Sequence, residues 1–308
     1  MSKIAFVFPG QGSQFPGMGK ELADNFSVAR ETFQEADDAL GSSLSKLCFE
    51  GPEEALKLTA NTQPAILTVS VAALRVVAAE TGLTADYLAG HSLGEYSALV
   101  VAGVIGFGDA VRTVRDRGTF MQEAVPVGVG AMAAILGVEP EVLAEICTEA
   151  AQGEVVAPAN FNSPGQIVIA GHAGAVNRAI EIAKAKGFRK AMLLPVSAPF
   201  HCTLMKPAAE RLATTLAGVG IAPFRMPVIT NVEAEPNSDP ARVRDLLVAQ
   251  VCAPVRWDGS VLKMVELGVS RFIEIGPGKV LSGLVKRIAK EAETRNVEDL
   301  ASLRTLVS

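Results

Sequence analysis

Ala89-Gly90-His91-Ser92-Leu93-Gly94-Glu95-Tyr96-Ser97 is the most informative stretch of the chain. An apolar run over residues 86–89 predicts a buried strand before it, and the apolar spacing of residues 97–101 predicts a helix after it. Between them, Gly90-x-Ser92-x-Gly94 is typical of a strand-to-helix turn that is too sharp for a Cβ at either glycine. Such a turn strains the serine backbone, exposes its hydroxyl above the sheet and aims free helix N–H groups at it. Ser92 is therefore a candidate nucleophile, although 28 glycines also allow the pattern to arise by chance.

Composition indicates a globular α/β enzyme. The 308 residues are 49% hydrophobic and 5% aromatic, which suits a large buried core. A formal net charge of −5 argues against nucleic-acid binding. The four cysteines lie far apart without a Cys-x-x-Cys pair, which argues against disulfides or a zinc site and favours a reducing cytoplasm. The apolar run at residues 4–8 is too short for a signal segment and Arg75 interrupts the run at 64–79, so we expect no secretion signal and no membrane helix.

The order of predicted elements indicates a large α/β domain interrupted by a small one. Residues 127–197 contain elements in the order β-α-β-β-α-β, the ferredoxin-like unit, so residues 1–126 and 198–308 are expected to form the large domain. Strands of the small unit are predicted at 131–136, 155–161, 166–170 and 190–195, and its helices at 140–151 and 173–186. Strands of the large domain are predicted at 4–8, 86–89, 226–231 and 271–275. Its main helices are predicted at 18–40, 64–79, 109–125, 205–217, 239–251 and 257–267.

A serine nucleophile needs a base and donors for an oxyanion. His201 lies in the loop that leaves the small unit, where clefts form, and is the candidate base; a buried histidine with a structural role is the alternative. His91 is directed away from its neighbour Ser92 by the turn. The backbone N–H of Leu93 and one from the Gly10-Gln11-Gly12 turn are candidate oxyanion donors. Between Ser92 and His201 no Asp or Glu stands at an obvious strand end, so another group, for example a backbone carbonyl, is expected to orient the imidazole.

Arg117 is a candidate anion-binding residue. The predicted helix 109–125 carries Arg112, Arg115 and Arg117, and Arg117 falls nearest the apolar stripe of that helix. An arginine drawn toward an apolar interior needs an anionic partner, which can be a structural carboxylate or a ligand. Helical spacing alone favours the structural carboxylate.

Motifs distributed from residue 3 to about residue 290 resemble those of the malonyl-CoA:acyl carrier protein transacylases of bacterial fatty acid synthesis. Each motif alone is weak, but together and in register they are specific for that family. They are Phe8-Pro9-Gly10-Gln11-Gly12-Ser13-Gln14, Thr62-Gln63-Pro64-Ala65, Gly90-His91-Ser92-Leu93-Gly94-Glu95, Arg117-Gly118, Asn160-Phe161-Asn162-Ser163-Pro164-Gly165-Gln166, Phe200-His201, Asn231-Val232 and Glu274-Ile275-Gly276-Pro277-Gly278. The resemblance implies a hydrolase-like α/β domain with a short parallel sheet and an inserted ferredoxin-like subdomain.

The resemblance also implies a ping-pong acyl transfer. Malonyl-CoA would acylate Ser92, and the malonyl group would then pass to the phosphopantetheine thiol of acyl carrier protein. His201 would act as general base and then as general acid, oriented by the main-chain carbonyl of Gln250. The backbone N–H groups of Gln11 and Leu93 would form the oxyanion hole. No bound cofactor and no metal are implied.

Recognition of the acyl group is implied for further residues. Arg117 would bind the malonyl carboxylate, which reverses the preference for a structural partner, and Gln63 and Asn160 would line the site. Phe200 would crowd an α-methyl group, so we expect malonyl to be preferred over methylmalonyl.

Acyl carrier proteins are acidic, so the pairs Arg189-Lys190 and Lys286-Arg287 are candidate docking residues, with ordinary surface charge as the alternative. We expect a cytoplasmic monomer.

Two other functions stay open. In a serine hydrolase or thioesterase water would accept the acyl group, and a non-catalytic carrier-binding module would not be acylated at Ser92 at all.

Overall fold

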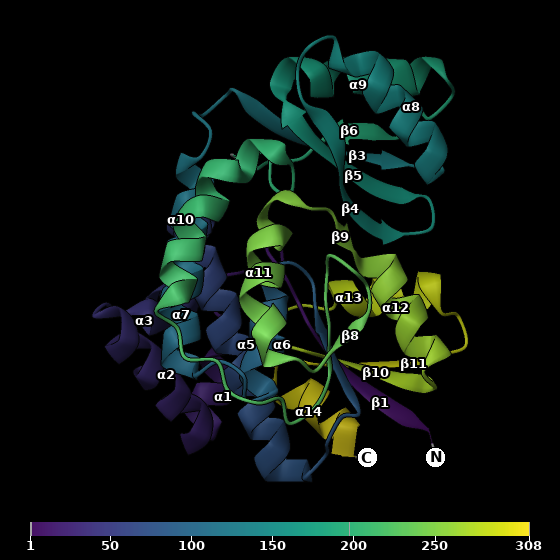
Figure 1. The fold of residues 1–308 in the computed structure, drawn as a ribbon. Helices are drawn as coiled ribbons and strands as arrows, with labels where there is room; N and C mark the ends of the chain where they lie inside the picture. Colours follow the sequence, from purple (N-terminus) through teal and green to yellow (C-terminus); the bar gives the residue numbers. More distant parts are fainter. Residues whose placement is uncertain (1, 197, 308) are drawn as a thin grey trace.

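The larger of two β-sheets forms the centre of the main body of the protein. The computed structural model describes residues 2–196 and 198–307 (Figure 1). The large sheet has the strand order β11-β10-β1-β2-β7-β8, and all its strands are parallel except β8. The strands are β1 Lys3–Phe8, β2 Tyr87–Gly90, β7 Val228–Ile229, β8 Pro236–Asn237, β10 Val269–Ile275 and β11 Glu293–Val297. The predicted α/β class with a parallel sheet is confirmed.

Strand β1 separates two hydrophobic cores, because successive side chains of a strand point to opposite faces of the sheet. Phe6 and Phe8 belong to a core formed with α2 (Ser27–Leu40), α5 (Thr59–Thr81) and α7 (Phe107–Glu123). Ala5 and Val7 belong to a second core on the other face, where α12 (Trp257–Glu266) and α13 (Val280–Ile288) pack. Burial on both faces explains why this strand has no polar–apolar alternation.

Helix α5 is the long central helix of the first core. Among the described residues it alone is long and apolar enough to cross a membrane, but 78% of its apolar window is buried, so it is a core helix. It begins at Thr59, before the predicted start, and Pro64 lies inside it. The polar residues before the predicted start are helical, and two of their side chains bond to carbonyls of the preceding segment. Asn61 donates to the Ala55 carbonyl and Thr62 to the Leu56 carbonyl.

The other predicted helices are present, with shifted ends. The predicted helix 18–40 is broken at Phe26, whose backbone is extended (φ −125°, ψ 125°), into α1 and α2. The predicted helix 239–251 begins with a 3₁₀ turn, Pro240–Arg242. The remaining helices are α1 Lys20–Asn25, α3 Leu44–Glu50, α4 Glu53–Leu56, α6 Gly94–Val101, α10 Lys206–Ala217, α11 Val243–Cys252 and α14 Leu300–Val307, with a 3₁₀ turn at Thr203–Met205.

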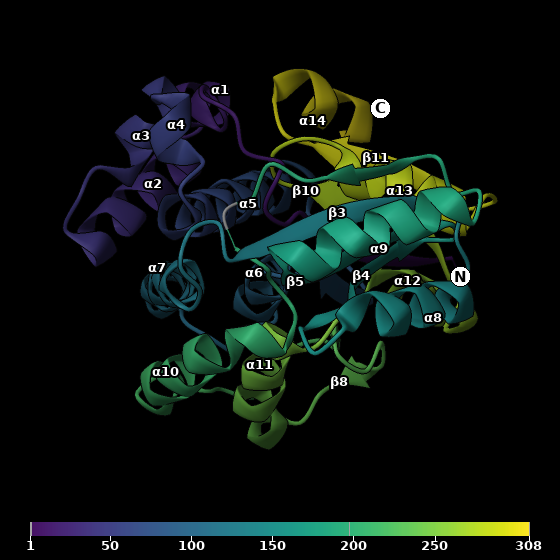
Figure 2. The same ribbon diagram turned by 90° about the horizontal axis from the view of Figure 1, so that it is seen from above.

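The small unit has the predicted β-α-β-β-α-β order. It comprises β3 Gly130–Leu136, α8 Pro140–Ala151, β4 Val156–Ser163, β5 Gln166–His172, α9 Ala173–Ala185 and β6 Ala191–Leu193. Helices α8 and α9 cover one face of its sheet (Figure 2). The strand order is β6-β3-β5-β4-β9, so β9 (Val255–Arg256), from outside the predicted range 127–197, extends the sheet parallel to β4. The sequence-based boundaries of the two domains stay a prediction.

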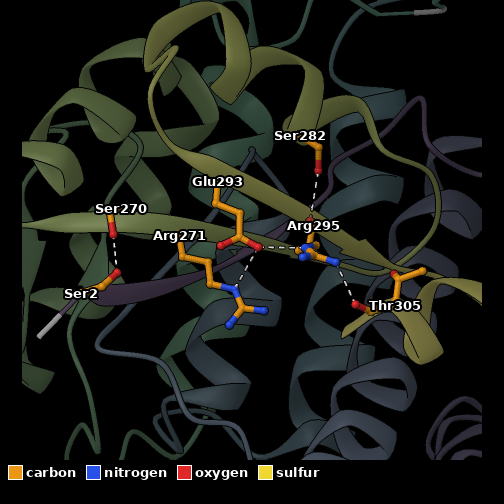
Figure 3. Close-up of polar contacts among 7 residues, drawn as sticks. All are labelled: Ser2, Ser270, Arg271, Ser282, Glu293, Arg295 and Thr305. Atoms are coloured by element: carbon orange, nitrogen blue, oxygen red, sulfur yellow. Dashed lines mark hydrogen bonds and ion pairs between the residues drawn. The ribbon is translucent and has the colours of Figure 1, made fainter. Parts of the chain in front are cut away.

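Strand β11 closes one edge of the large sheet and was not predicted, because Glu-Thr-Arg-Asn-Val has no apolar pattern. Polar side chains hold it in place (Figure 3). Glu293 Oε1 accepts from Arg295 Nε at 2.8 Å and lies 3.6 Å from Arg271 Nε on the neighbouring strand. Arg295 also donates to the Thr305 carbonyl on α14, so the edge strand and the C-terminal helix are fixed together.

Candidate active site

Ser92 stands in a sharp turn between β2 and α6. Its backbone is in the left-handed region (φ 52°), which is strained for a residue with a side chain. A Cβ on Gly90 would lie 1.9 Å from the carbonyl carbon of Gly94, and a Cβ on Gly94 would lie 2.2 Å from the Phe8 oxygen. Both glycines are therefore sterically required, and the turn has the conformation predicted for a nucleophile elbow.

His201 is the histidine that contacts Ser92. Its Nε2 lies 2.8 Å from Ser92 Oγ, and its Nδ1 lies 2.9 Å from the main-chain oxygen of Gln250 on α11. Burial, reinforced by the nearby positive charge of Arg117, lowers the pKa of His201 to about 3. The imidazole is therefore neutral at pH 7. With Nδ1–H donated to the carbonyl, Nε2 is the nitrogen free to accept the serine proton.

His91 and Cys202, the neighbours of these two residues, point elsewhere. His91 Nε2 lies 2.9 Å from Asn162 Oδ1 on β4. The Cys202 thiol donates to the Pro199 carbonyl, and burial raises the pKa of this thiol to about 11. Neither residue competes for the role of base or nucleophile.

Arg117 reaches the same hydroxyl from α7. Its Nη2 donates to Ser92 Oγ at 3.1 Å and to Gln250 Oε1 at 3.0 Å, and its Nη1 donates to Gln63 Oε1 at 2.7 Å. These partners are neutral, and no carboxylate of the described residues pairs with Arg117, although its side chain is 1% exposed. The nearby Glu95 carboxylate acts on Arg117 only through Gln250, which accepts from Arg117 and donates to Glu95. Arg117 therefore has no direct ion pair among the described residues and stays a candidate receptor for an anion.

A cavity of about 120 Å³ opens at the Ser92 hydroxyl. Its walls come from both sheets and from the helices around them: Gln11, Gln63, His91, Ser92, Leu93, Arg117, Met121, Met132, Asn160, Leu194, Val196, Phe200 and His201. It therefore brings together the predicted residues Gln63, Asn160 and Phe200 with the nucleophile. Its apolar lining by Met121, Met132, Leu194 and Val196 was not predicted, because these residues read in sequence as ordinary core positions.

Two residues that line the cavity have backbone N–H groups that remain candidate oxyanion donors. Gln11 and Leu93 line the cavity, and among the described residues neither N–H donates to an acceptor. Leu93 lies at the start of α6, where the helix dipole also favours negative charge. A Cβ on Gly10 would lie 2.5 Å from the His91 oxygen, so only glycine lets this loop approach the nucleophile turn.

A second cavity, of about 240 Å³, adjoins the first. Both cavities are lined by Gln11, His91, Asn160 and Leu194. The outer cavity extends to Gln166 on β5 and to Val280 at the start of α13. The outer cavity therefore lies between the Ser92 cavity and the exposed start of α13.

Comparison with known proteins assigns the chain to a family. It matches the acyl transferase domain over residues 5–305. The malonyl CoA-acyl carrier protein transacylase of Bacillus subtilis is 53% identical over 300 residues, which cover 97% of this chain and 94% of the relative. That of Escherichia coli K12 is 54% identical over 288 residues, 94% of this chain and 93% of the relative.

The chain belongs to the malonyl CoA-acyl carrier protein transacylase family. An acyl carrier protein S-malonyltransferase from Vibrio cholerae matches with a TM-score of 0.96 and 53% identity, over 99% of this chain and 100% of that one. A malonyl-transacylase solved in complex with its type II PKS acyl-carrier protein matches with a TM-score of 0.97 and 50% identity, over 99% of each chain. The resemblance stated from the motifs is confirmed.

The basic pairs proposed for docking in this transacylase lie outside the cavity. Arg189-Lys190 precedes β6 and Lys286-Arg287 ends α13, and all four side chains are exposed. The Lys190 carbonyl accepts from the N–H of Leu136, and Leu136 pairs with Gln166 across the small sheet. Gln166 Oε1 in turn accepts from Arg287 at 2.6 Å. The two pairs, distant in sequence, therefore lie at the same end of the small sheet.

Two buried polar residues of the transacylase motifs had no role assigned from sequence. Glu95 and Asn231 are 2% and 1% exposed and lie directly beneath the Ser92 turn. Burial raises the pKa of Glu95 to about 7. The available sequence signal was an acidic residue, Glu95, in the first turn of a predicted apolar helix.

Proposed function

We propose that this chain transfers the malonyl group from malonyl-CoA, through an ester on Ser92, to the phosphopantetheine thiol of acyl carrier protein in fatty acid synthesis. The proposal rests on one observation, that the side chains of His201 and Arg117 both contact the hydroxyl oxygen of Ser92. Ser92 Oγ contacts a neutral imidazole nitrogen of His201 at 2.8 Å and a buried guanidinium nitrogen of Arg117 at 3.1 Å. A nucleophile, its base and a receptor for a negatively charged acyl group thus meet in one cavity.

In the first half-reaction His201 Nε2 takes the proton of Ser92 Oγ as this oxygen attacks the thioester carbonyl. The N–H groups of Gln11 and Leu93 bind the resulting oxyanion. The Gln250 carbonyl stabilises the imidazolium through Nδ1–H, in the place of the usual triad carboxylate. The intermediate then breaks its C–S bond, and the imidazolium returns the proton to the departing CoA thiolate.

The second half-reaction runs through the same groups in reverse. His201 takes the proton of the carrier thiol, whose sulfur attacks the Ser92 ester. Breaking the ester C–O bond returns the proton to Ser92 Oγ. Because thioester exchange is nearly isoenergetic, the site must favour a thiol over water by positioning it and by limiting water access. A cavity of about 120 Å³ with an apolar lining suits that requirement.

Arg117 is proposed to select the acyl group. A bidentate guanidinium–carboxylate pair in a dry cavity distinguishes malonyl from acetyl far better than an apolar pocket distinguishes one alkyl group from another. Gln63 supports this role by holding Nη1 of Arg117, and Asn160 lines the cavity. Phe200, next to the base and 8% exposed, is proposed to exclude an α-methyl substituent.

The carrier protein is proposed to dock at the end of the small sheet that gathers Arg189-Lys190 and Lys286-Arg287. The outer cavity leads from Ser92 toward this face, at Gln166 and Val280, which offers a route for the phosphopantetheine arm. The exposed apolar side chain of Val280, 54% exposed, lies at the mouth of this route. Basic residues around an apolar contact match an acidic partner.

We expect the active form to be a cytoplasmic monomer. The proposed nucleophile, base and carboxylate receptor all come from one chain, so chemistry requires no partner subunit. The four cysteines are free thiols, in keeping with a reducing compartment.

Intact-mass spectrometry tests the proposal. Malonyl-CoA should add one malonyl group to the chain, and nothing to a Ser92→Ala variant. Holo acyl carrier protein should then remove that group and become malonylated. Release of free malonate at the same rate with and without carrier would instead identify a hydrolase, and the absence of any mass increase would identify a non-catalytic binding module.

A further inference from the structure

Beneath the Ser92 turn lies a buried carboxylate that the proposed mechanism does not use. Glu95 is in the first turn of α6 and is 2% exposed. Its Oε2 accepts two hydrogen bonds, from the backbone N–H of Asn231 at 3.0 Å and from Gln250 Nε2 at 2.7 Å. A carboxylate placed in a core at this cost in hydration is expected to hold its donors in fixed positions.

The first donor, Asn231, holds the nucleophile turn. Its side-chain amide spans the turn, because Nδ2 donates to the Gly90 carbonyl at 2.7 Å and Oδ1 accepts from the Ser92 N–H at 2.6 Å. These bonds bridge the strained residue and the strand before it. The side chain of Asn231 therefore supports the left-handed backbone of Ser92, while the backbone N–H of Asn231 is bound by Glu95.

The second donor, Gln250, holds the base. Its Nε2 also donates to the Ser92 carbonyl at 3.0 Å, and its main-chain oxygen accepts from His201 Nδ1 at 2.9 Å. One residue thus contacts Glu95 with its side chain and the imidazole with its backbone.

These contacts form a closed ring, Ser92–Asn231–Glu95–Gln250–His201–Ser92. We infer that Glu95 is a positioning residue, whose carboxylate fixes the distance between the nucleophile and the base by anchoring both of their supports. The inference rests on the proposed acyl transfer through Ser92. In a Ser-His-Asp triad the acid orients the imidazole directly. Here the carboxylate acts one residue further back, through Gln250.

A matched set of variants tests the inference. Glu95→Ala removes the anchor, whereas Glu95→Gln keeps an amide oxygen in its place. The control is Glu274→Ala. Glu274 is equally buried, its pKa is likewise raised to about 7 by burial, and it accepts the N–H groups of Leu281 and Ser282, so its hydrogen bonds lie outside the ring. The readout is the rate at which a small fluorophosphonate labels Ser92, measured with folding checked by circular dichroism.

We expect Glu95→Ala to label about 10²-fold more slowly than the parent, the cost typical of a misplaced reacting group. Glu95→Gln should recover most of the rate, and Glu274→Ala should label at the parent rate. For malonyl-CoA, kcat of Glu95→Ala should fall more than KM rises, because Arg117 keeps its hydrogen bond to Gln63 and the cavity walls remain. Labelling of Glu95→Ala at the rate of Glu274→Ala would overturn the inference.

Asn231→Ala provides an independent variant if Glu95→Ala does not fold. It removes the turn support and leaves the carboxylate, and should show the same loss of labelling; a parent-like rate would overturn the inference. The probe needs neither malonyl-CoA nor carrier protein. If the parent is labelled by the probe but not by malonyl-CoA, the proposed function fails, and the comparison of variants still decides the role of Glu95.

Discussion

Arg117 Nη2 donates a hydrogen bond to Ser92 Oγ at 3.1 Å, so the buried cation and the candidate nucleophile are in direct contact. The guanidinium stabilises negative charge on the serine oxygen and, by its charge, disfavours protonation of His201. Its partners Gln63 and Gln250 are neutral amides, which can hold the guanidinium without neutralising it. As the proposed carboxylate receptor, Arg117 would link recognition of an anionic acyl group to the protonation state of the Ser92–His201 pair.

Replacing this cation should change the choice of substrate. For Arg117→Ala we expect kcat/KM for malonyl-CoA to fall by about 10²–10⁴-fold, equivalent to the roughly 3–5 kcal/mol lost when one partner of a buried charged pair is removed. The kcat/KM for acetyl-CoA, whose acyl group has no carboxylate, should fall much less. The ratio of kcat/KM for acetyl-CoA to kcat/KM for malonyl-CoA should therefore rise. Single-turnover acylation of Ser92 by each thioester measures both values.

The control for this experiment is on the same helix. Arg112 is exposed and pairs with Asp109, so Arg112→Ala should leave both rates unchanged. An equal loss of malonyl and acetyl transfer in Arg117→Ala would contradict the proposed carboxylate receptor.

The low pKa of His201 predicts an unusual pH profile. Base catalysis needs the neutral imidazole, and its pKa is about 3 rather than the usual value of about 6.5. The rate of Ser92 labelling should therefore stay level as the pH falls through 6.5 and decline only at lower pH. Arg117→Gln removes a charge that depresses this pKa, so the decline should move to higher pH. A parent midpoint near pH 6.5, unchanged in the variant, would contradict the assignment.

The same depressed pKa affects stability with a definite sign. Below about pH 6.5 the unfolded chain binds a proton at His201 that the folded chain does not, so this residue lowers stability as the pH falls toward 3. His201→Gln removes this contribution. The free energy of unfolding is measured by urea titration at pH 7 and at pH 5. We expect its decrease from pH 7 to pH 5 to be smaller in His201→Gln than in the parent. An equal fall in both proteins would contradict the buried neutral state.

Sequence patterns predicted the elements whose own residues carry the signal. The glycines around Ser92, the apolar run of β1 and the strand–helix order of the small unit are local features, and each is found where it was expected. Strand β11 was missed because it is polar and is held by Glu293, Arg295 and neighbours on other elements. The two-residue strand β9 has no pattern of its own and is defined by its pairing with β4.

The site was predictable to the same extent. Helical spacing brought Arg117 toward the interior but could not indicate its direct partners, because Gln63 and Gln250 are distant in sequence. The ring around Glu95 depends on contacts between α6, α11 and the loop after β7. Such contacts exist only in the folded protein, so a sequence pattern could indicate the residue and not its partners.

The sharpness of the nucleophile turn can be tested by adding one carbon atom. In Gly94→Ala the new Cβ would lie 2.2 Å from the Phe8 oxygen on the central strand, so backbone must move. We expect a loss of about 1–3 kcal/mol in the free energy of unfolding and a loss of Ser92 labelling. Gly283→Ala, in α13 with nothing within 4 Å of the new Cβ, should instead gain about 0.5–1 kcal/mol. Thermal and urea unfolding measure both effects, and equal stability of the two variants would argue against a close-packed turn.

Reversing charge at the proposed docking face should affect the carrier step and spare the nucleophile. Lys286 and Arg287 are exposed at the end of α13, and Arg287 bonds across to the small sheet. For the double variant Lys286→Glu/Arg287→Glu we expect KM for holo carrier protein to rise about tenfold at low salt, where surface charges attract an acidic partner most strongly. The difference from the parent should shrink as salt increases. Labelling of Ser92 by the small probe should not change, because these side chains lie outside the cavity.

The control variant is Lys57→Glu. Lys57 is exposed and lies between α4 and α5, so its replacement should leave KM for the carrier as it is in the parent. A rise in KM as large for Lys57→Glu as for the double variant would show a general effect of net charge and would remove the case for docking at this face.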